Sequence, residues 1–149
     1  MKSLHLAGPD DLERLLPMVA SFQTERAGQQ PDEEHLSAAL TPLLEGAPQG
    51  AIWLIGPRKA PVGYVVAAFG WSVESGGLTA TLDQIYVRPA VRRRGMGSEA
   101  LFQLTQALRQ GGVTALQMEV SASDEPLLRF CRRARLQDRD GAMLMRCAL

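Results

Sequence analysis

Several features that mark specialised proteins are scarce in this chain of 149 residues. Its two cysteines, Cys131 and Cys147, provide neither a disulfide framework nor the paired spacing of a metal site. Aromatic residues make up 5% of the sequence, and Lys+Arg and Asp+Glu both number 16, so net charge gives no overall attraction to nucleic acid or membrane. No apolar run approaches the about 18 residues of a membrane span, and the N-terminus lacks a sustained apolar segment. We therefore expect a cytoplasmic protein without metal, membrane or nucleic-acid partners.

The rest of the composition is that of an ordinary globular domain. Hydrophobic residues make up 46% of the chain and charged residues 21%. A chain of this length can bury a substantial core, and it contains no repeat, linker or low-complexity segment. Residues 1–149 are therefore expected to form one domain.

The hydrophobic pattern alternates between strand and helix periods. We expect strands at residues 3–7, 51–55, 61–71, 78–87 and 115–120, and a closing strand at 142–147. We expect helices that begin near residues 8–11 (with a kink at Pro17), at residues 32–44, at residues 98–108 and after Asp124. This order, βααβββαβαβ, indicates an α/β (α+β) fold.

One stretch combines charge, glycine and a change of hydrophobic period. Arg92 is followed by Gly95 and Gly97, between the expected strand that ends at Val87 and a helical run that begins at Ser98. Glycines at such a turn let the backbone approach a ligand, and a helix start leaves N–H groups unpaired at the positive end of its dipole. These features favour a nucleotide diphosphate. The expected cradle is made of consecutive residues: Arg92, Arg93, Arg94, Gly95, Met96, Gly97 and Ser98.

Two common phosphate loops do not fit this stretch. The P-loop needs a Gly-Lys-Ser/Thr ending, and the dinucleotide loop needs glycine where this sequence has Arg92. The spacing Arg-x-x-Gly-x-Gly, with Val87 and Pro89 before it, instead closely resembles the acetyl-CoA loop of the GNAT family of N-acetyltransferases. The resemblance implies a mixed central sheet whose fourth and fifth strands splay apart. It also implies that the pantetheine arm of acetyl-CoA pairs with the backbone of Ile85, Tyr86 and Val87, and that the pyrophosphate meets the amides of residues 93–98.

The resemblance also suggests a general base. The stretch Thr-Leu-Asp-Gln-Ile-Tyr-Val at 81–87 looks most like the diamine-acetyltransferase branch, in which a carboxylate of the fourth strand is the proposed base; that position is Asp83. Such a group is needed because a protonated amine must lose a proton before it attacks the thioester. Glu119 is the second candidate, because Met-Glu-Val-Ser-Ala-Ser is similar to the corresponding strand of ribosomal-protein-acetylating relatives. Either acid could instead be an ordinary polar residue of its strand.

The sequence departs from the family at the start of the last helix. Relatives usually have Asn there, near the cofactor, and seven residues on a Tyr that serves as the acid. The corresponding residues in this chain are Asp124 and Cys131. A thiol could protonate the departing CoA thiolate or carry the acyl group as a nucleophile, or Cys131 could simply pack as a small apolar residue.

Substrate selection in the family falls to the loop between the first two helices and to the turn between the third and fourth strands. The resemblance places four candidate acceptor-binding residues there, namely Phe22, Glu25, Trp71 and Glu74, with Asp32, Glu33 and Glu34 near by. An acidic, aromatic mouth would attract a cationic amine such as a polyamine. The alternative is that these acids form the solvated face of a helix.

These observations predict an acetyl-CoA-dependent N-acetyltransferase that acts on a primary amine of a small molecule by direct attack. Three alternatives stay open: acetylation of peptide or protein N-termini, a non-catalytic acetyl-CoA sensor, and a nucleic-acid-binding module built on the arginine clusters. Relatives are often dimers and the segment 142–147 is apolar, so we also expect a homodimer.

Overall fold

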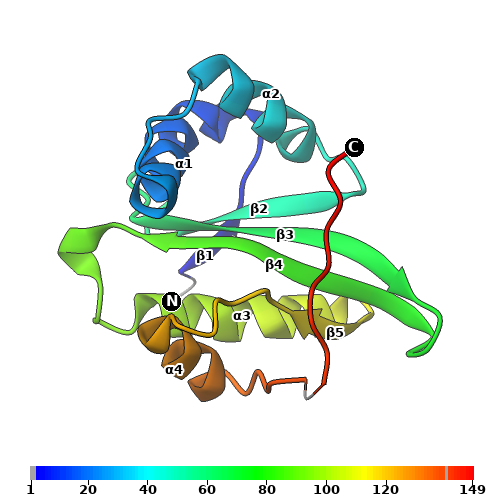
Figure 1. Cartoon of the computed structure of the whole chain (residues 1–149). Coiled ribbons are helices and arrows are strands. Elements are labelled where there is room, and N and C mark those ends of the chain that lie inside the picture. The colour runs from blue at the N-terminus through cyan, green and yellow to red at the C-terminus, as the bar shows by residue number, and fades with distance from the viewer. Residues whose placement is uncertain (1–2, 140) are drawn as a thin grey trace.

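A mixed five-stranded sheet runs through the computed structural model, which describes residues 3–139 and 141–149 (Figure 1). The strands follow one another in chain order across the sheet: β1 (Leu4–Leu6), β2 (Gly50–Ile55), β3 (Gly63–Ser72), β4 (Gly77–Val87) and β5 (Val113–Gln117). The first four strands are antiparallel to their neighbours, and β5 runs parallel to β4. The mixed α/β architecture expected from the sequence is confirmed.

Helices cover both faces of the sheet. After a short 3₁₀ turn at Pro9–Asp11, helices α1 (Leu12–Ala27) and α2 (Glu33–Leu44) lie on one face; α3 (Met96–Gln110) and α4 (Glu125–Arg133) lie on the other (Figure 1). Pro17 lies inside α1, which continues beyond it. Within residues 3–139, no helix combines the length and apolar character that a membrane crossing requires.

Each face of the sheet has its own buried core, because side chains alternate along a strand. Ile52 and Leu54 of β2 pack with Leu15, Met18 and other residues of α1 and α2. On the opposite face, Ile55 belongs to a second cluster that includes Leu101, Leu104 and Leu108 of α3. The helical periodicity seen in the sequence is therefore the inner face of each helix.

A β-bulge interrupts β4 at Asp83. Two consecutive residues of β3, Val66 and Ala67, lie opposite Gln84 and Leu82, so Asp83 is the extra residue on β4. Before the bulge the even-numbered residues of β4 pack toward α3, whereas after it they pack toward α1 and α2. The bulge therefore changes which side chains reach each helical layer.

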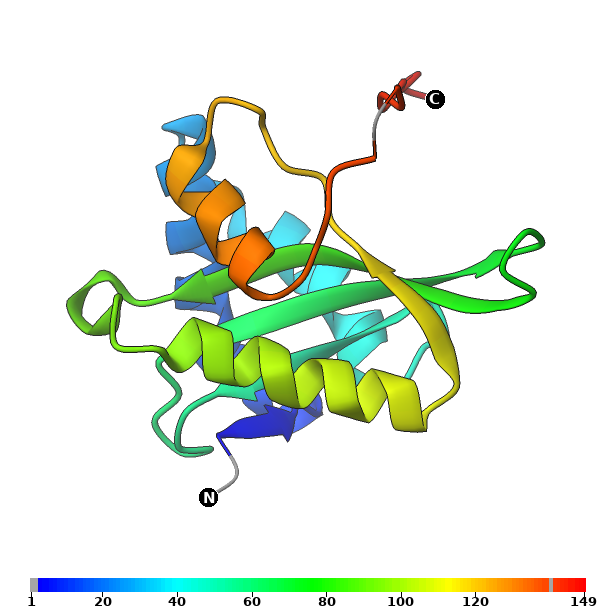
Figure 2. The same cartoon turned by 90° about the horizontal axis from the view of Figure 1, so that it is seen from below.

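The pairing between β4 and β5 is short. Only Leu78 to Thr81 of β4 pair with β5, and the remainder of β4 pairs with β3 alone. Figure 2 shows β5 diverging from β4 toward the segment that leads into α4. The splayed arrangement that the family resemblance implied is present.

Two expected elements differ at the C-terminal side. The fifth strand ends at Gln117, so Glu119 lies in the coil after it rather than within the strand. The closing strand expected at 142–147 does not form: residues 142–149 are exposed and belong to none of the described strands. The apolar run at residues 142–145 gave that segment strand character, but a strand also needs a neighbour, and among the described residues none pairs with it.

Candidate functional site

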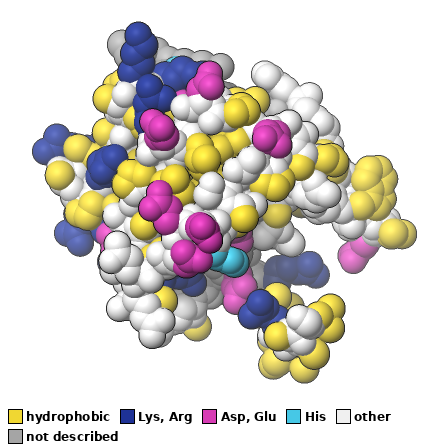
Figure 3. Space-filling model, turned by 90° about the horizontal axis from the view of Figure 1, so that it is seen from above, with side chains coloured by type: hydrophobic (Ala, Val, Ile, Leu, Met, Phe, Trp, Pro, Cys, Tyr) yellow, Lys and Arg dark blue, Asp and Glu magenta, His cyan; other side chains and the backbone are white. Residues whose placement is uncertain are grey.

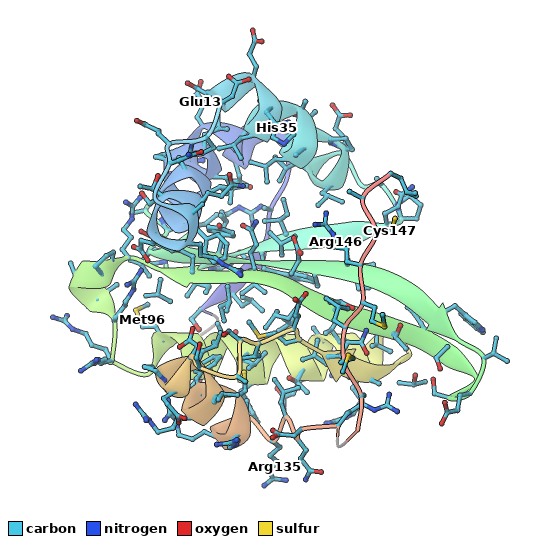
Figure 4. The ribbon with its side chains drawn as sticks, viewed as in Figure 1. Glu13, His35, Met96, Arg135, Arg146 and Cys147 are labelled. Atoms are coloured by element: carbon cyan, nitrogen blue, oxygen red, sulfur yellow. The ribbon has the colours of Figure 1, made fainter. Side chains whose placement is uncertain are left out.

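The glycine-containing loop connects the end of β4 to α3. After a 3₁₀ turn at Pro89–Val91, the backbone of Arg93 (φ 64°) and Gly95 (φ 80°) is left-handed, and α3 begins at Met96. Figure 4 labels Met96 at this start of α3, below the end of β4. Two left-handed residues turn the chain sharply enough to bring successive N–H groups to one side.

The start of α3 is suited to bind an anion. The N–H groups of Met96, Gly97 and Ser98 lie in the first turn, so they have no acceptor within the helix and stand at the positive end of its dipole. Arg93 and Arg94 are exposed, and neither forms an ion pair within the described residues. The loop therefore offers backbone donors and two uncommitted cations to a diphosphate.

The two glycines serve different purposes. Gly95 has the positive φ that favours glycine, whereas Gly97 has an ordinary helical backbone. A Cβ added at Gly97 would lie 3.4 Å from Cε1 of Phe130 in α4, so glycine there permits close packing of α3 against α4. A side chain at residue 97 would therefore not strain the backbone, whereas a side chain at residue 95 would.

Arg92 is committed to protein partners. Its Nη2 donates to both Glu25 carboxylate oxygens at 2.9 and 2.8 Å, its Nε donates to the Val87 carbonyl at 2.7 Å, and its guanidinium lies 5.4 Å from the centre of the Tyr86 ring. The sequence assigned Arg92 to the cofactor and Glu25 to the acceptor, but in the structure these two residues bind each other. The pair links the last turns of α1 to the end of β4, beside the cradle.

The second half of β4 borders the opening between β4 and β5. Ile85, Tyr86 and Val87 pair with β3 on one side and have no β5 neighbour on the other. In an antiparallel ladder, alternate residues direct their N–H and C=O groups to opposite sides, so part of this backbone faces the opening. The residues that the resemblance assigned to the pantetheine arm therefore lie at an unpaired strand edge.

The bulge places Asp83 near a buried hydroxyl. Asp83 is exposed, and the next residue, Gln84, accepts a 2.7 Å hydrogen bond from the Tyr64 hydroxyl. Burial is the main cause that raises the pKa of Tyr64, and the neighbouring Tyr86 and the Asp83 carboxylate raise it further. The Tyr64 hydroxyl therefore stays protonated throughout the neutral range and donates its hydrogen bond to Gln84.

Sequence reasoning missed Tyr64, because it stands in an apolar strand where an aromatic residue is normally core. It belongs to an aromatic cluster beneath α1. The Phe22 ring lies 6.4 Å from Tyr64 and 6.5 Å from Tyr86, both edge-on, and the two tyrosine rings are 5.8 Å apart. Of the proposed acceptor-binding residues, Phe22 thus lies in this group near Asp83.

Glu25 lies next to this group through Arg92, whereas Trp71 and Glu74 do not gather there. Trp71, 70% exposed, lies opposite Leu78 near the tip of the β3–β4 hairpin, and Glu74 is in its turn. That tip is eight residues along β4 from Tyr86, about 26 Å at about 3.3 Å per residue. The acids near α2 stabilise that helix: Asp32 accepts from the Glu34 amide at 3.3 Å, and Glu33 and Glu34 occupy its first turn.

Cys131 lies in α4, and Asp124 is the N-cap residue of that helix. Cys131 is 5% exposed and its Sγ lies 3.9 Å from the Met118 Sδ, so the side chain packs between α4 and the segment after β5. Burial, with a smaller contribution from Asp124, raises the pKa of Cys131 and keeps it a neutral thiol at neutral pH. Asp124 caps the helix by accepting from the Leu127 amide at 3.2 Å. Glu119, the second candidate base, is exposed.

Comparisons with known proteins agree on one family. Residues 14–135 match the model of the Acetyltransferase (GNAT) family. Integron cassette protein HFX_CASS3, from the mobile metagenome of Cole Harbour Salt Marsh, is 31% identical, with 99% of this chain and 90% of that chain covered and a TM-score of 0.86. A candidate acetyltransferase from Arthrobacter sp. FB24 is 28% identical, with 100% and 95% covered and a TM-score of 0.79.

A third similar structure extends the comparison of folds. The aminoglycoside acetyltransferase meta-AAC0020 from an uncultured soil metagenomic sample, solved with sisomicin, is 17% identical, with 98% and 95% covered and a TM-score of 0.78. Among curated proteins, no significant match was found. The family match spans most of the chain and includes the splayed strands and the loop before α3. The chain belongs to the acetyltransferase (GNAT) family and is an acyltransferase.

Proposed function

We propose that this enzyme transfers an acetyl group from acetyl-CoA to a primary amine of a small, multiply charged cation of the diamine or polyamine class. The observation that carries the proposal is the combination of an amide-lined helix start with an unpaired edge of β4 beside it. The first suits a diphosphate, and the second suits an extended arm that carries amide groups. Acetyl-CoA, the donor generally used in this family, has both.

Residues of the loop before α3 and of the second half of β4 can bind acetyl-CoA. The amides of residues 93–98 and the exposed Arg93 and Arg94 would meet the pyrophosphate, and the outward-facing backbone groups of Ile85 to Val87 would pair with the pantetheine arm. Arg92 contributes less charge than expected, because Glu25 neutralises it. Its contribution is to hold α1 against the end of β4.

The acceptor would approach from the side of α1. Asp83 is exposed at the bulge, and the rings of Phe22 and Tyr86 lie close to the Tyr64–Gln84 hydrogen bond on the same face. A carboxylate attracts an ammonium group and can then accept its proton. Asp83 accepts one proton from the ammonium group and releases it to solvent, which leaves a neutral amine. The amine then attacks the thioester carbonyl, and its second proton passes to Asp83 as the N–C bond forms. The C–S bond breaks, and the departing CoA thiolate takes a proton from solvent.

Direct attack does not require Cys131. Its thiol is buried, and the pKa of Cys131 is raised, so the thiolate needed for a covalent acyl-enzyme is disfavoured. Nor do the described residues place a histidine beside it: His5 lies in β1 and His35 in α2. We therefore propose a ternary complex rather than an acyl-enzyme.

A thiol-release assay tests this function. Acetyl-CoA would be combined with diamines and polyamines, aminoglycosides, free amino acids and peptides with free N-termini. We expect release that depends on the amine and is fastest with diamines or polyamines. Release with peptides alone would replace the small-molecule assignment by N-terminal acetylation. Calorimetric binding of CoA with no release for any amine would instead identify a sensor.

A further inference from the structure

A hollow of about 390 Å³ lies between α1, the turn from β2 to β3 and the residue that follows β4. Three cations and three apolar residues form most of its lining: Arg14, Lys59 and Arg88, with Pro17, Pro61 and Val62. Among the described residues, no Asp or Glu lines it. Residues 85–87 and 93–98, to which we assign acetyl-CoA, do not contribute to the lining, so the hollow is separate from the donor site.

Two of the three cations have no acidic partner in the part of the chain that the structure describes. Neither Lys59 nor Arg88 forms an ion pair there. The Nε of Arg88 donates to the Pro61 carbonyl oxygen at 3.5 Å, which leaves both Nη groups of Arg88 for a ligand. A guanidinium can bind two oxygens of one carboxylate or phosphate at once, so Arg88 is suited to an oxyanion.

The third cation, Arg14, is held by a buried acid. Asp11 is 4% exposed and accepts hydrogen bonds from the Gly8 amide at 2.9 Å and from the Arg14 Nη1 at 3.3 Å. The Nη2 of Arg58 lies 3.8 Å from the other oxygen of Asp11. Because one carboxylate faces two arginines, these three residues leave a net positive charge beside the hollow. Figure 3 shows lysine and arginine side chains gathered along the left side of the face that α1 and α2 cover.

A second hollow, of about 320 Å³, provides a contrast within the same molecule. It shares Pro17 with the first but lies between α1 and α2. Glu13 and Glu33 line it, and none of the lysines and arginines that the structure describes does. The charges on the two sides of Pro17 are thus sorted by sign, so a multiply charged anion is attracted to the first hollow and repelled from the second.

We propose that the first hollow binds a small organic anion that carries two or three carboxylate or phosphate groups on a compact apolar body. Arg14, Lys59 and Arg88 bind the acidic groups, and their mutual repulsion is relieved by the bound charge. Pro17 and Pro61 contact the apolar body, which a bare inorganic ion lacks. The volume falls in the range of about 300–1,000 Å³ that is usual for small-molecule sites. None of these residues takes part in acetyl transfer, so the site adds a second ligand to the enzyme.

Calorimetry with trimesate, the symmetric benzene tricarboxylate, tests the class of ligand. We expect binding about tenfold or more weaker for benzoate, which keeps the ring but has one carboxylate, and for inorganic phosphate, which lacks the apolar body. Phosphate that binds as tightly as trimesate, or trimesate that does not bind at millimolar concentration, would overturn the proposal.

A matched pair of variants tests the residues. Arg88→Gln should weaken trimesate binding by about tenfold, the cost of one charge-assisted contact. Arg109→Gln removes the same charge from the exposed last turn of α3, far along the chain from the hollow, and should bind trimesate as the natural chain does. Lys59→Gln should behave as Arg88→Gln does. Equal affinities in all three variants would show that net charge alone attracts the probe, contrary to the proposal.

Amide chemical shifts of ¹⁵N-labelled protein locate the bound probe. In free protein and in protein saturated with CoA, trimesate should shift the amides of Lys59, Ala60 and Val62, and it should not displace CoA. Shifts confined to residues 93–98, or displacement of CoA, would place the anion in the cradle and overturn the proposal. These measurements involve no amine and no transfer. A failure here therefore leaves the proposed transferase function standing, and inactivity in the thiol-release assay leaves this site standing.

Discussion

The two halves of β4 differ in how completely they are paired. From Leu78 to Thr81 the strand has β3 on one side and β5 on the other, and Ala80 is fully buried. From Leu82 to Val87 it has β3 alone. Asp83 marks the junction, where a bulge re-aims the side chains.

The difference shows that the candidate ligand-binding site lies where β4 lacks a hydrogen-bonded neighbour in β5. Buried backbone N–H and C=O groups need partners, so a strand edge left open must be satisfied by water or by a ligand. In the first half of β4 the sheet satisfies them. In the second half, some of these N–H and C=O groups face the opening between β4 and β5. The cradle that contains Gly95 comes next in the chain. We therefore expect changes of exposed side chains beyond the bulge to affect activity, and changes that crowd the β3–β4 ladder to affect folding.

The largest effect is expected at the bulge. Asp83→Asn keeps the shape of the side chain but removes the group that accepts the proton from the amine. Turnover should fall by about 10²–10⁴-fold, the usual contribution of a general base, whereas CoA affinity by calorimetry should stay the same. The acidic limb of the pH–rate profile should change with it.

Glu119→Gln is the matched control, because Glu119 is also an exposed acid, in the segment that follows β5. It should retain most of its activity. Full turnover in Asp83→Asn together with loss in Glu119→Gln would assign the proton transfer to Glu119 instead.

The next effect concerns folding. A Cβ added at Gly63, the first residue of β3, would collide with the carbonyl oxygen of Tyr86, at the end of the β3–β4 ladder where β4 finishes. Because backbone cannot move aside as a side chain does, Gly63→Ala should lower the free energy of unfolding by about 3 kcal/mol. Urea denaturation measures it. Gly8→Ala, where a Cβ meets open space, should change stability little, and equal losses in the two variants would contradict the steric argument.

Much of the fold around the cradle could be predicted from the sequence. The strand–loop–helix order around the cradle, the inner faces of the helices and the presence of a strand after α3 all follow from local periodicity and glycine spacing. The bulge could not be predicted, because it depends on the register between β3 and β4, and no residue type at Asp83 requires it. Without the bulge, the partnership of Tyr64 with Gln84 could not be predicted either.

Residues far apart in the chain were the other source of error. Trp71 and Phe22 were grouped through the family resemblance, but the hairpin is long enough to carry Trp71 to the opposite end of β4. The segment 142–147 has strand character, yet local pattern cannot say whether a neighbouring strand is available to it. Glu25 and Arg92 have opposite charges, but only the fold shows that they meet.

A smaller effect is expected within the cradle. Gly95 has a φ of 80°, where an L-residue is strained by about 1–2 kcal/mol. Gly95→Ala should therefore disfavour the loop conformation that presents the amides and weaken CoA binding by about 5- to 30-fold in calorimetry. Gly97→Ala is the control, because its φ is ordinary and its new methyl group only approaches Phe130. Stronger loss at residue 97 than at residue 95 would show that packing against α4, not backbone conformation, limits binding.

The smallest effect is expected from the pair that borders the cradle. The Arg92 and Glu25 side chains are 41% and 44% exposed and 2.8 Å apart, and such partly exposed pairs are worth less than about 1 kcal/mol. Their main influence is on the electrostatic potential at the cradle, where the pyrophosphate would bind. Glu25→Gln leaves the Arg92 charge uncompensated there, so CoA should bind up to about fivefold more tightly at low salt.

Salt and a matched acid decide whether that gain is electrostatic. It should fade toward molar salt, where the Debye length is about 3 Å. Glu13→Gln removes an exposed acid from the other end of α1, as Figure 4 shows, and should leave CoA affinity unchanged. Arg92→Gln should weaken binding. If Glu25→Gln weakened it as well, the pair would matter because it fixes α1 to the end of β4, and neutralisation of Arg92 would not explain its role.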